Sequence, residues 1–449
     1  MSAEFRRALA CLALVCAACG DSAPESRPRD LLLITVDTLR PDFVSAYGQE
    51  RPRTPTIDGL ASRGVLYERA YSASPMTGPS HASMFSGLVP AEHGLKRNGR
   101  VIDEAVPWLP RDLQELGYST AGVVGAKVLD QRFGFQRGFD HFDDAIGDDW
   151  SQNERRASEG VAHAIEWLEQ QDEGPVFLWV HVYDPHAPYE AELAGTSPRG
   201  GRAFYRRRIE ALGVPARDKL IGDWRDYGRE VRYTDGALAP LLEAWEARGP
   251  ESVICLTSDH GEGLGEHGYM GHGRELWEEQ LLVPLIVVAP ELTPGTRYPH
   301  AVSLVDLAAT LWGLCVPELP SAFTQSPWPR TLEDARPRDL LIAERPEIIG
   351  AGLRPILDET ERRTVGAPHT ALIEDVQKYV WRRGRDDLYF DLIEDPHEKD
   401  GSLEGHEAEV EHLRARHVEH LEGLRILGRG EALDDADTRA MLNALGYDG

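Results

Sequence analysis

The stretch LLLITVD, residues Leu31–Asp37, is an almost uninterrupted apolar run that ends at an aspartate. Runs of similar length recur along the chain, and segments with an amphipathic helical pattern separate them. This alternation is typical of a mostly parallel sheet with helices on both faces, so the sequence predicts an α/β fold. The expected strands are Leu31–Val36, Ser119–Val124, Val176–Val182, Val253–Thr257 and Leu285–Val288, and the expected helices include Thr56–Gly64, Leu109–Gly117, Ala162–Gln170 and Tyr233–Arg248.

The composition limits the classes of partner. The chain has 449 residues, 41% of them hydrophobic and 27% charged, which fits one large globular domain with an appendage, or two domains. It carries 48 Lys and Arg against 75 Asp and Glu, a formal net charge of −27. So acidic a surface repels polyanions, and nucleic-acid binding is not expected. An anionic substrate must therefore be held by a local positive feature, such as a metal ion or a histidine cluster.

The first residues resemble an export signal. Two arginines precede an apolar run, Ala8–Ala18, which is too short to span a bilayer. The junction Cys19-Gly20 resembles the cleavage box of a bacterial lipoprotein, with Cys16 in place of the usual aliphatic residue. We expect residues 1–19 to be a signal peptide, Cys19 to be lipidated and residues 20–29 to form a tether; plain secretion is the alternative. The protein is expected to be exported, periplasmic or at the cell surface, and attached to the membrane through the lipid anchor.

The remainder of the chain divides at a proline-rich segment, PELPSAFTQSPWPR, that begins at Pro317. We predict a large α/β domain over residues 30–316, a linker over 317–336 and a smaller C-terminal α+β subdomain over 337–449. The subdomain contains a charged helix, Glu407–Leu424. Only Cys255 and Cys315 remain after the signal, so the fold does not depend on a disulfide framework.

Acidic residues and histidines follow three of the predicted strands. In open α/β sheets ligands bind beyond the carboxyl ends of the strands, so these side chains are expected to gather at one edge. Carboxylates and imidazoles are ligands of hard and borderline divalent cations, and a metal site is the simplest explanation. The residues are Asp37, Asp184, His186, Asp259 and His260.

The segment Thr77-Gly78-Pro79-Ser80-His81 predicts the start of a helix. Pro79 fits the first turn, where its missing N–H is not needed, and Thr77 fits the N-cap position. A hydroxyl at a helix N-terminus lies at the positive end of the helix dipole, which favours an alkoxide and a bound oxyanion. Most threonines in this position only cap the helix, so the functional interpretation depends on the other segments.

Several segments, in order, resemble the sulfatase family of the alkaline-phosphatase superfamily over nearly all of the chain after the tether. LLLITVDTLRPDFVSAYG is similar to the metal-binding first strand, and TGPSHASMFSG to the nucleophile motif. PVFLWVHVYDPHAPY is similar to the substrate-histidine segment, and LTSDHGEGLGEHGYMGHG to the second metal segment. The resemblance implies a large sheet sandwiched by helices, as in alkaline phosphatase and sulfatases, and a metal-dependent ester hydrolase.

The sequence departs from the family pattern at several positions. The nucleophile position carries Thr77, whereas sulfatases need Cys or Ser there for conversion to formylglycine. Threonine resembles the superfamily's phosphodiesterases, including phosphonate monoester hydrolases, and its phosphotransferases. Thr38 replaces one carboxylate of the first-strand pair, His81 the motif's arginine and His272 a later lysine, while Lys127 is only a loose match to the Lys-x-His segment. These changes argue against a standard formylglycine sulfatase.

By this resemblance we expect one divalent cation, Ca, Mn or Zn, held by Asp37, Asp259, His260 and the hydroxyl of Thr77. Coordination would lower the pKa of the hydroxyl. The alkoxide would then attack in line and form a covalent intermediate, which water later releases.

The remaining candidates are expected to bind substrate or to assist the leaving group. His186 and His272 would bind equatorial oxygens or protonate the leaving group, and His81 is assigned a catalytic role with them. Asn98 resembles a substrate amide donor, or is a turn residue. Asp184 either orients His186 or joins His186 and His272 around a second metal.

Two other residues of these segments receive less weight. His181 lies inside a predicted strand and is expected to be a satisfied core imidazole. Glu262 is expected to be a loop cap or a ligand.

Two classes of function follow. The first is a hydrolase of phosphoric diester, phosphonate or sulfuric ester bonds in a small molecule, glycan or lipid headgroup; its variants are a sulfate-ester hydrolase without formylglycine and a phospho-headgroup transferase. The second is a non-catalytic surface lipoprotein that keeps the fold as a binding module. Because every proposed ligand and the hydroxyl are present together, the enzyme is favoured.

Overall fold

The computed structural model describes residues 28–146, 154–172, 174–189, 201–321, 323–325, 327–329, 338–346, 367–433 and 438. The expected signal peptide with Cys19 and most of the expected tether lie outside these residues. So do parts of the expected linker and C-terminal subdomain, whose boundaries stay predictions. None of the described helices combines the length and the apolar character that a bilayer span requires.

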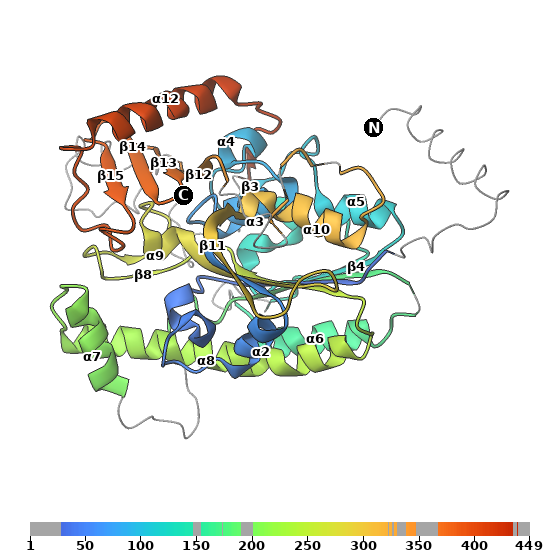
Figure 1. The fold of residues 1–449 in the computed structure, drawn as a ribbon. Helices are drawn as coiled ribbons and strands as arrows, with labels where there is room; N and C mark the ends of the chain where they lie inside the picture. The colour runs from blue at the N-terminus through green and yellow to red at the C-terminus, as the bar shows by residue number, and fades with distance from the viewer. Residues whose placement is uncertain are drawn as a thin grey trace.

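An eight-stranded sheet forms the centre of the molecule (Figure 1). Its strand order is β11-β2-β10-β7-β1-β6-β4-β5. Every neighbouring pair is parallel except the two made by β10, which runs antiparallel to β2 and β7. The strands are β1 (Leu31–Val36), β2 (Val65–Tyr71), β4 (Ser119–Val123), β5 (His141–Asp143), β6 (Val176–Val182), β7 (Val253–Ser258), β10 (Leu282–Val288) and β11 (Thr296–Ser303).

Helices cover both faces of this sheet (Figure 1). Alternate residues of β1 point into two separate cores, Leu31 and Leu33 into one and Leu32 and Ile34 into the other, as the two-residue period of a strand requires. The first core is closed by α3 (Thr77–Ser86), α5 (Leu109–Glu115) and α10 (Leu307–Cys315), and the second by α2 (Pro55–Arg63), α6 (Ala157–Leu168) and α8 (Asp218–Glu246). The predicted α/β architecture with a mostly parallel sheet is confirmed.

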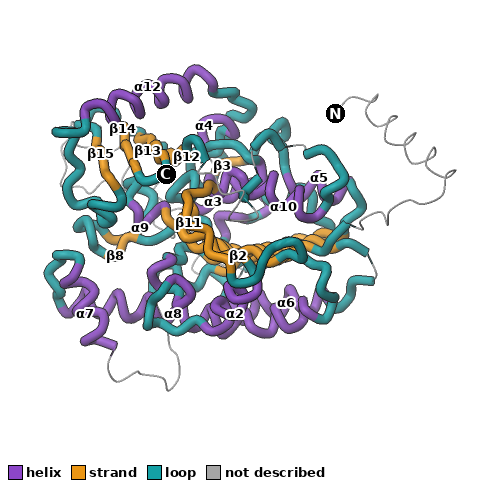
Figure 2. Tube along the Cα trace, in the orientation of Figure 1, coloured by secondary structure: helices purple, strands orange, loops and turns teal. Residues whose placement is uncertain are grey.

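A smaller antiparallel sheet follows in the C-terminal part, visible beside the main sheet in Figure 2. It consists of β12 (Leu341–Arg345), β13 (His369–Glu374), β14 (Gln377–Arg382) and β15 (Leu388–Asp391), and α12 (Glu407–Gly423) packs on it. Apolar residues of its other face share a core with Tyr71 and Leu281 of the main body.

Shorter elements complete the described fold. A two-residue strand near the C-terminus, β16 (Glu431–Ala432), pairs with β3 (Arg100–Val101). The others are α4 (Pro90–His93), α7 (Gly201–Ala211), α9 (Glu278–Leu281), β8 (Gly263–Leu264), β9 (Met270–Gly271) and the 3-10 turns Pro41–Phe43, Ser45–Tyr47, Lys127–Leu129, Gln131–Phe133 and Leu304–Asp306.

Candidate active site

The register of the three central strands places their ends together. Val36, the last residue of β1, is paired with Val182 of β6 and Ser258 of β7. Asp37 and Asp259 follow directly on neighbouring strands, and both are buried. The edge predicted from the sequence is therefore where these two carboxylates meet.

The helix start differs from the prediction by one residue. Thr77 is the first helical residue of α3, and Met76 occupies the N-cap position without a side-chain hydrogen bond. Instead, Asn98 caps the helix through its Oδ1, which accepts a hydrogen bond from the N–H of Gly78 at 2.7 Å. The predicted N-cap role of Thr77 is wrong, and its hydroxyl is available for other contacts. Thr77 Oγ1 lies 3.3 Å from Asp37 Oδ2 and 3.3 Å from His260 Nε2.

The group Asp37, Asp259 and His260 fits a divalent cation. One ligand atom from each lies within 4.8 Å of the others, and all three side chains are buried. Asp37 Oδ1 and Asp259 Oδ2 have no hydrogen-bond partner among the described residues, which is costly for buried carboxylate oxygens unless a cation is bound. His260 Nδ1 lies 2.9 Å from the carbonyl oxygen of Gly261 and must donate to it. The lone pair of Nε2 therefore faces the carboxylates, as a metal ligand requires.

The electrostatics of this group favour binding of a cation. Burial raises the pKa of Asp37, against the effect of the imidazoles of His186 and His260. Burial and the nearby charge of Asp37 raise the pKa of Asp259. Burial alone would lower the pKa of His260, but the two carboxylates raise it overall. Burial makes ionisation of both carboxyl groups less favourable. A bound cation would therefore be the most effective way to keep both as anions.

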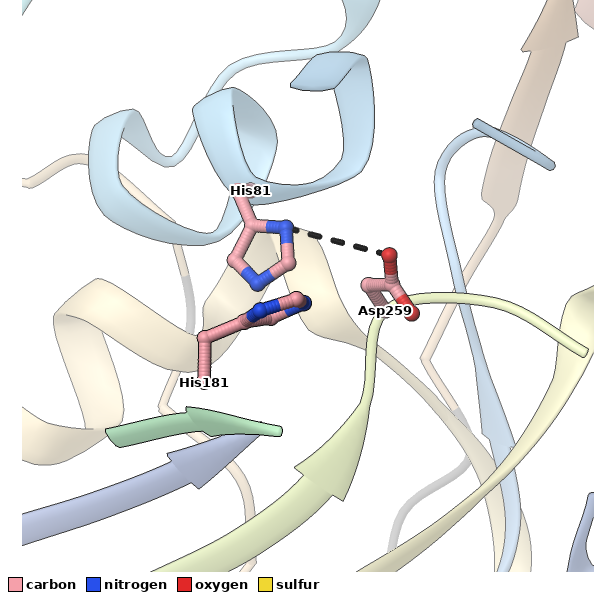
Figure 3. A group of neighbouring side chains, drawn as sticks. All are labelled: His81, His181 and Asp259. Carbon is pink, nitrogen blue, oxygen red and sulfur yellow. Dashed lines mark ion pairs between the residues drawn. The ribbon is translucent and has the colours of Figure 1, made fainter. Parts of the chain in front are cut away.

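His81 and His181 lie beside the same carboxylate, as Figure 3 shows for the group His81, His181 and Asp259. Both nitrogens of His81 are engaged, because Nδ1 lies 2.8 Å from the Thr77 carbonyl oxygen and Nε2 lies 3.1 Å from Thr35 Oγ1. Burial lowers the pKa of His81 to about 3, so the ring is neutral. These contacts support a positioning role for His81 at the backbone of Thr77, and they do not favour the catalytic role that was assigned to His81 from the sequence.

The expectation for His181 is wrong. Neither ring nitrogen has a hydrogen-bond partner among the described residues, although Nε2 lies 3.4 Å from Asp37 Oδ2. A satisfied core imidazole would have both nitrogens paired. His181 pairs in register with Thr35, and these are the polar side chains of two otherwise apolar strands. In the sequence, a polar residue inside each of these two apolar runs was the feature that could have pointed to His181.

The two candidate substrate histidines also reach the site. The ring centres of His186 and His272 are 4.9 Å apart, and those of His272 and His260 are 4.4 Å apart. Burial lowers the pKa of His186 to about 4 and that of His272 well below its usual value. His186 Nδ1 lies 2.6 Å from the Ala187 carbonyl oxygen and donates to it, so the neutral ring presents a lone pair at Nε2. This tautomer accepts a proton or binds a metal, and does not protonate a leaving group.

Asp184 does not take part in this group. Its described contacts are the N–H of Ala157 at 2.6 Å and the guanidinium of Arg156 at 2.9 Å. Orientation of His186 by Asp184, and a second metal bound by Asp184, His186 and His272, find no support in these contacts. Another acid occupies that place: Glu262 Oε1 lies 3.2 Å from His272 Nδ1, and burial raises the pKa of Glu262 to about 7.

The chain also matches known proteins. Residues 29–315 match the model of the Sulfatase family. The chain belongs to the sulfatase family. It is a sulfatase-like ester hydrolase, and the site described above lies within the matched residues.

Two relatives share about a quarter of their aligned residues with this sulfatase-family chain. It is 24% identical over 405 residues to an N-acetylglucosamine-6-O-sulfatase of Bacteroides thetaiotaomicron, which covers 69% of this chain and 72% of the relative. It is 23% identical over 431 residues to a choline-sulfatase of Rhizobium meliloti, with 82% and 81% covered.

Solved structures share the fold. The structure of BT4656 in complex with its substrate D-glucosamine-2-N,6-O-disulfate has a TM-score of 0.69 at 20% identity, covering 88% of this chain and 98% of that one. The phosphonate monoester hydrolase of Agrobacterium radiobacter has a TM-score of 0.65 at 20% identity, covering 89% and 95%. Both likenesses establish the architecture.

Proposed function

We propose that this sulfatase-family protein is a metal-dependent hydrolase of sulfuric or phosphoric ester bonds, with the hydroxyl of Thr77 as its nucleophile. One observation supports this above all others: the buried hydroxyl lies 3.3 Å from both Asp37 and His260, at the first residue of α3. A threonine that only stabilised the helix would direct its oxygen to the backbone of that helix.

A threonine at position 77 also distinguishes between two kinds of nucleophile, a formylglycine and an unmodified hydroxyl. Formylglycine is an aldehyde, and it forms from a side chain with a primary alcohol or thiol. Oxidation of a threonine would give a ketone, because its β-carbon already bears a methyl group. We therefore infer that the hydroxyl itself attacks, without oxidative maturation.

A divalent cation bound by Asp37, Asp259 and His260 would neutralise ester oxygens and favour the ionised hydroxyl. The residues of the chain do the rest. Asp37 Oδ2 accepts the hydrogen bond of Thr77 Oγ1 and is placed to take its proton. Asn98 holds the first turn of α3 through Gly78. Burial excludes water from the group, which strengthens each of these interactions.

The reaction proceeds in two steps. In the first, a bond forms between Thr77 Oγ1 and the sulfur or phosphorus atom, and the bond from that atom to the ester oxygen breaks. The alcohol leaves with that oxygen and takes a proton from solvent. In the second step, water attacks the same sulfur or phosphorus atom, and the bond from that atom to Thr77 Oγ1 breaks. Thr77 takes back its proton from Asp37, and inorganic sulfate, a phosphate monoester or a phosphonate is released. His186, whose Nδ1 donates to the Ala187 carbonyl oxygen and leaves a lone pair on Nε2, would accept the proton of this water.

Substrate and location are proposed from two sources. Sulfatases among the relatives are named for N-acetylglucosamine sulfate esters and for choline sulfate, so a small-molecule or glycan ester is proposed here. The lipoprotein-like box at Cys19 supports export and attachment to the membrane surface. Radiolabelled fatty-acid incorporation that Cys19→Ser abolishes would support the anchor, and incorporation unaffected by Cys19→Ser would exclude it.

A panel assay tests the proposed activity. Purified protein, stripped of metal and reloaded with Ca, Mn or Zn, is given aryl sulfate, aryl phosphate, bis-aryl phosphate and aryl phosphonate monoesters. Thr77→Ala should lower the rate on the best ester by about 10⁴-fold or more, because the covalent route is lost. Thr120→Ala is the matched control, since Thr120 is equally buried but hydrogen-bonds to Asp140 away from the site. Undiminished rates in Thr77→Ala would refute the nucleophile, and tight ester binding without turnover would indicate a binding module.

A further inference from the structure

Arg274 lies beside the candidate active site, in the loop between β9 and α9 and two residues after His272. Its guanidinium carbon is 5.3 Å from the centre of the Tyr269 ring, and the hydroxyl of Tyr269 donates to the carbonyl oxygen of His272 at 2.7 Å. Burial and the charges of His260 and Arg274 lower the pKa of His272, so the guanidinium is close to that ring. Arg274 is therefore a positive charge next to the site.

The charge of Arg274 is not neutralised by an ion pair with any of the described residues. The acid that follows it in the sequence, Glu275, is engaged elsewhere. Its Oε1 lies 3.2 Å from Arg385 Nη1, and its Oε2 lies 3.3 Å from His369 Nδ1. Arg274 is partly exposed, so its guanidinium is accessible to a ligand that enters the site.

The loop that carries Arg274 is packed against the start of α3. Gly273 has a φ of 81°, which glycine adopts readily, and a Cβ built on it would lie 3.5 Å from Met76 Cγ. Met76 directly precedes Thr77. On its other side the loop is held by Leu276, which belongs to the core shared with the smaller sheet. The fold therefore fixes the backbone of Arg274 beside the helix that begins with Thr77.

The depth of the site indicates on which side of the substrate Arg274 lies. Thr77, Asp37 and Asp259 are fully buried, whereas Arg274 is partly exposed. In an in-line displacement the attacking and leaving oxygens lie on opposite sides of the reacting atom. Attack from the buried side therefore directs the alcohol of the ester toward solvent, which is the side of Arg274.

A leaving oxygen on this side requires a positive group. His186 donates its Nδ1 proton to the Ala187 carbonyl oxygen and presents a lone pair at Nε2, so it does not protonate that oxygen. A guanidinium keeps its charge in proteins and has several N–H donors in one plane, which suits an oxyanion. Arg274 has this charge and no competing carboxylate in the described part of the chain.

We propose that Arg274 is a further catalytic residue, which stabilises the leaving oxygen of the ester. As the bond from sulfur or phosphorus to this oxygen breaks, the electron pair stays on the oxygen and the guanidinium N–H groups donate hydrogen bonds to it. Arg274 keeps its protons, and the alcohol takes its proton from solvent. A fixed positive charge here favours esters of weakly acidic alcohols, because their leaving oxygen holds its negative charge least well. This inference rests on the proposed function, since it assigns a role in the same reaction.

The test varies the acidity of the leaving alcohol. Full-length, metal-loaded wild type and Arg274→Gln are compared on nitrophenyl, chlorophenyl and phenyl sulfates, and on the same three esters of methylphosphonic acid. Arg274→Gln should lower kcat/KM about tenfold for the nitrophenyl ester and about 300-fold for the phenyl ester, because phenol is the poorer leaving group. Arg274→Lys keeps the charge and should recover most of the loss on the phenyl ester.

Arg383→Gln is the matched control, because it removes one positive charge from an exposed position outside this loop. It should change kcat/KM by less than about twofold for every ester, as expected for a surface charge. Thermal unfolding of each variant checks its fold.

Each outcome decides the role of Arg274. An equal loss on all three esters of a series would assign Arg274 to substrate binding and overturn the proposal, as would unchanged rates. A leaving-group effect in an enzyme whose Thr77→Ala variant is fully active would refute the proposed nucleophile and leave the role of Arg274 standing. An inactive Thr77→Ala variant together with an equal loss in Arg274→Gln would do the reverse. Absence of turnover by wild type with every metal would refute both.

Discussion

Replacing Asp37 with asparagine should stabilise the metal-free protein while removing its stabilisation by metal. Asp37 and Asp259 are buried, and one carboxylate oxygen of each lies within 4.8 Å of the other. Two charges at this separation repel by about 3 kcal/mol at the effective dielectric constant of about 20 that suits proteins. Against the effect of burial, the two carboxylates raise the pKa of His260, which favours protonation of this ring in the metal-free protein and would offset part of the repulsion. We therefore expect metal-free Asp37→Asn to gain about 1–2 kcal/mol in the free energy of unfolding.

The stabilisation that metal gives to the folded protein should be smaller in Asp37→Asn than in wild type. A cation present at 100 times its dissociation constant stabilises the folded state by about 2.7 kcal/mol. Wild type should show a stabilisation of this order with the preferred ion among Ca, Mn and Zn, and Asp37→Asn should lose most of it because a ligand and a charge are gone. Chemical unfolding with chelator or with added metal measures both quantities. Asp140→Asn is the control, since Asp140 binds Thr120 and Gln114 outside the site and should leave the metal response intact.

Either of two results would contradict the metal site or the repulsion between the two carboxylates. Wild type that is equally stable with chelator and with each metal would show that the carboxylates hold no cation. Metal-free Asp37→Asn that is less stable than metal-free wild type would show that hydrogen bonding, and not charge repulsion, dominates at this position.

Three further predictions concern single side chains. Thr77→Ser keeps the hydroxyl and should retain activity within about tenfold, whereas a loss as large as that of Thr77→Ala would mean that the methyl group and not the oxygen matters. Asn98→Ala removes the acceptor of the Gly78 N–H, and it should lower the free energy of unfolding by about 1 kcal/mol and kcat by about 100-fold. Calorimetry measures the first effect and steady-state kinetics the second. An unchanged kcat would show that Asn98 only caps the helix. Burial lowers the pKa of His267, but the Glu279 carboxylate 2.8 Å away raises it overall to about 9. Because the pKa is raised in the folded state, the ion pair of His267 should contribute about 1–2 kcal/mol to the free energy of unfolding at pH below about 6.5, a figure already reduced for its partial exposure. This contribution should be lost as the pH rises through about 9. Chemical unfolding of His267→Gln and of wild type across this pH range measures it, and a difference in stability that does not change with pH would contradict it.

The sequence predicts the centre of the fold better than its edges. β1 and β6 begin and end where their apolar runs do, because strands buried on both faces contain almost only apolar residues. β2 was not predicted, since Glu68 and Arg69 interrupt its apolar pattern where its side chains are partly exposed. β11 at the sheet edge contains Pro299, which edge strands tolerate. α8 begins at Asp218, well before the predicted Tyr233, because its first half is polar on the exposed face.

The site residues that could be predicted from the sequence are those that directly follow the end of a strand. Asp37, Asp259 and His260 belong to this class, because register alone brings them together. The roles of His81 and Asp184 depend on where side chains turn after the backbone is placed, and the motif alone carries no such information. His181 was not predicted to be a site residue because it lies within a strand. It pairs in register with Thr35, and both are polar residues in otherwise apolar strands.

Trapping the covalent intermediate tests the role of Thr77 most directly. Protein reacting with its best ester is quenched in acid within one turnover and digested, and the peptide that contains Thr77 is analysed by mass spectrometry. If Thr77 is the nucleophile, a sulfuryl or phosphoryl group appears on its oxygen with substrate and disappears as the reaction ends. An unmodified peptide during active turnover, or an adduct on another residue, would contradict it.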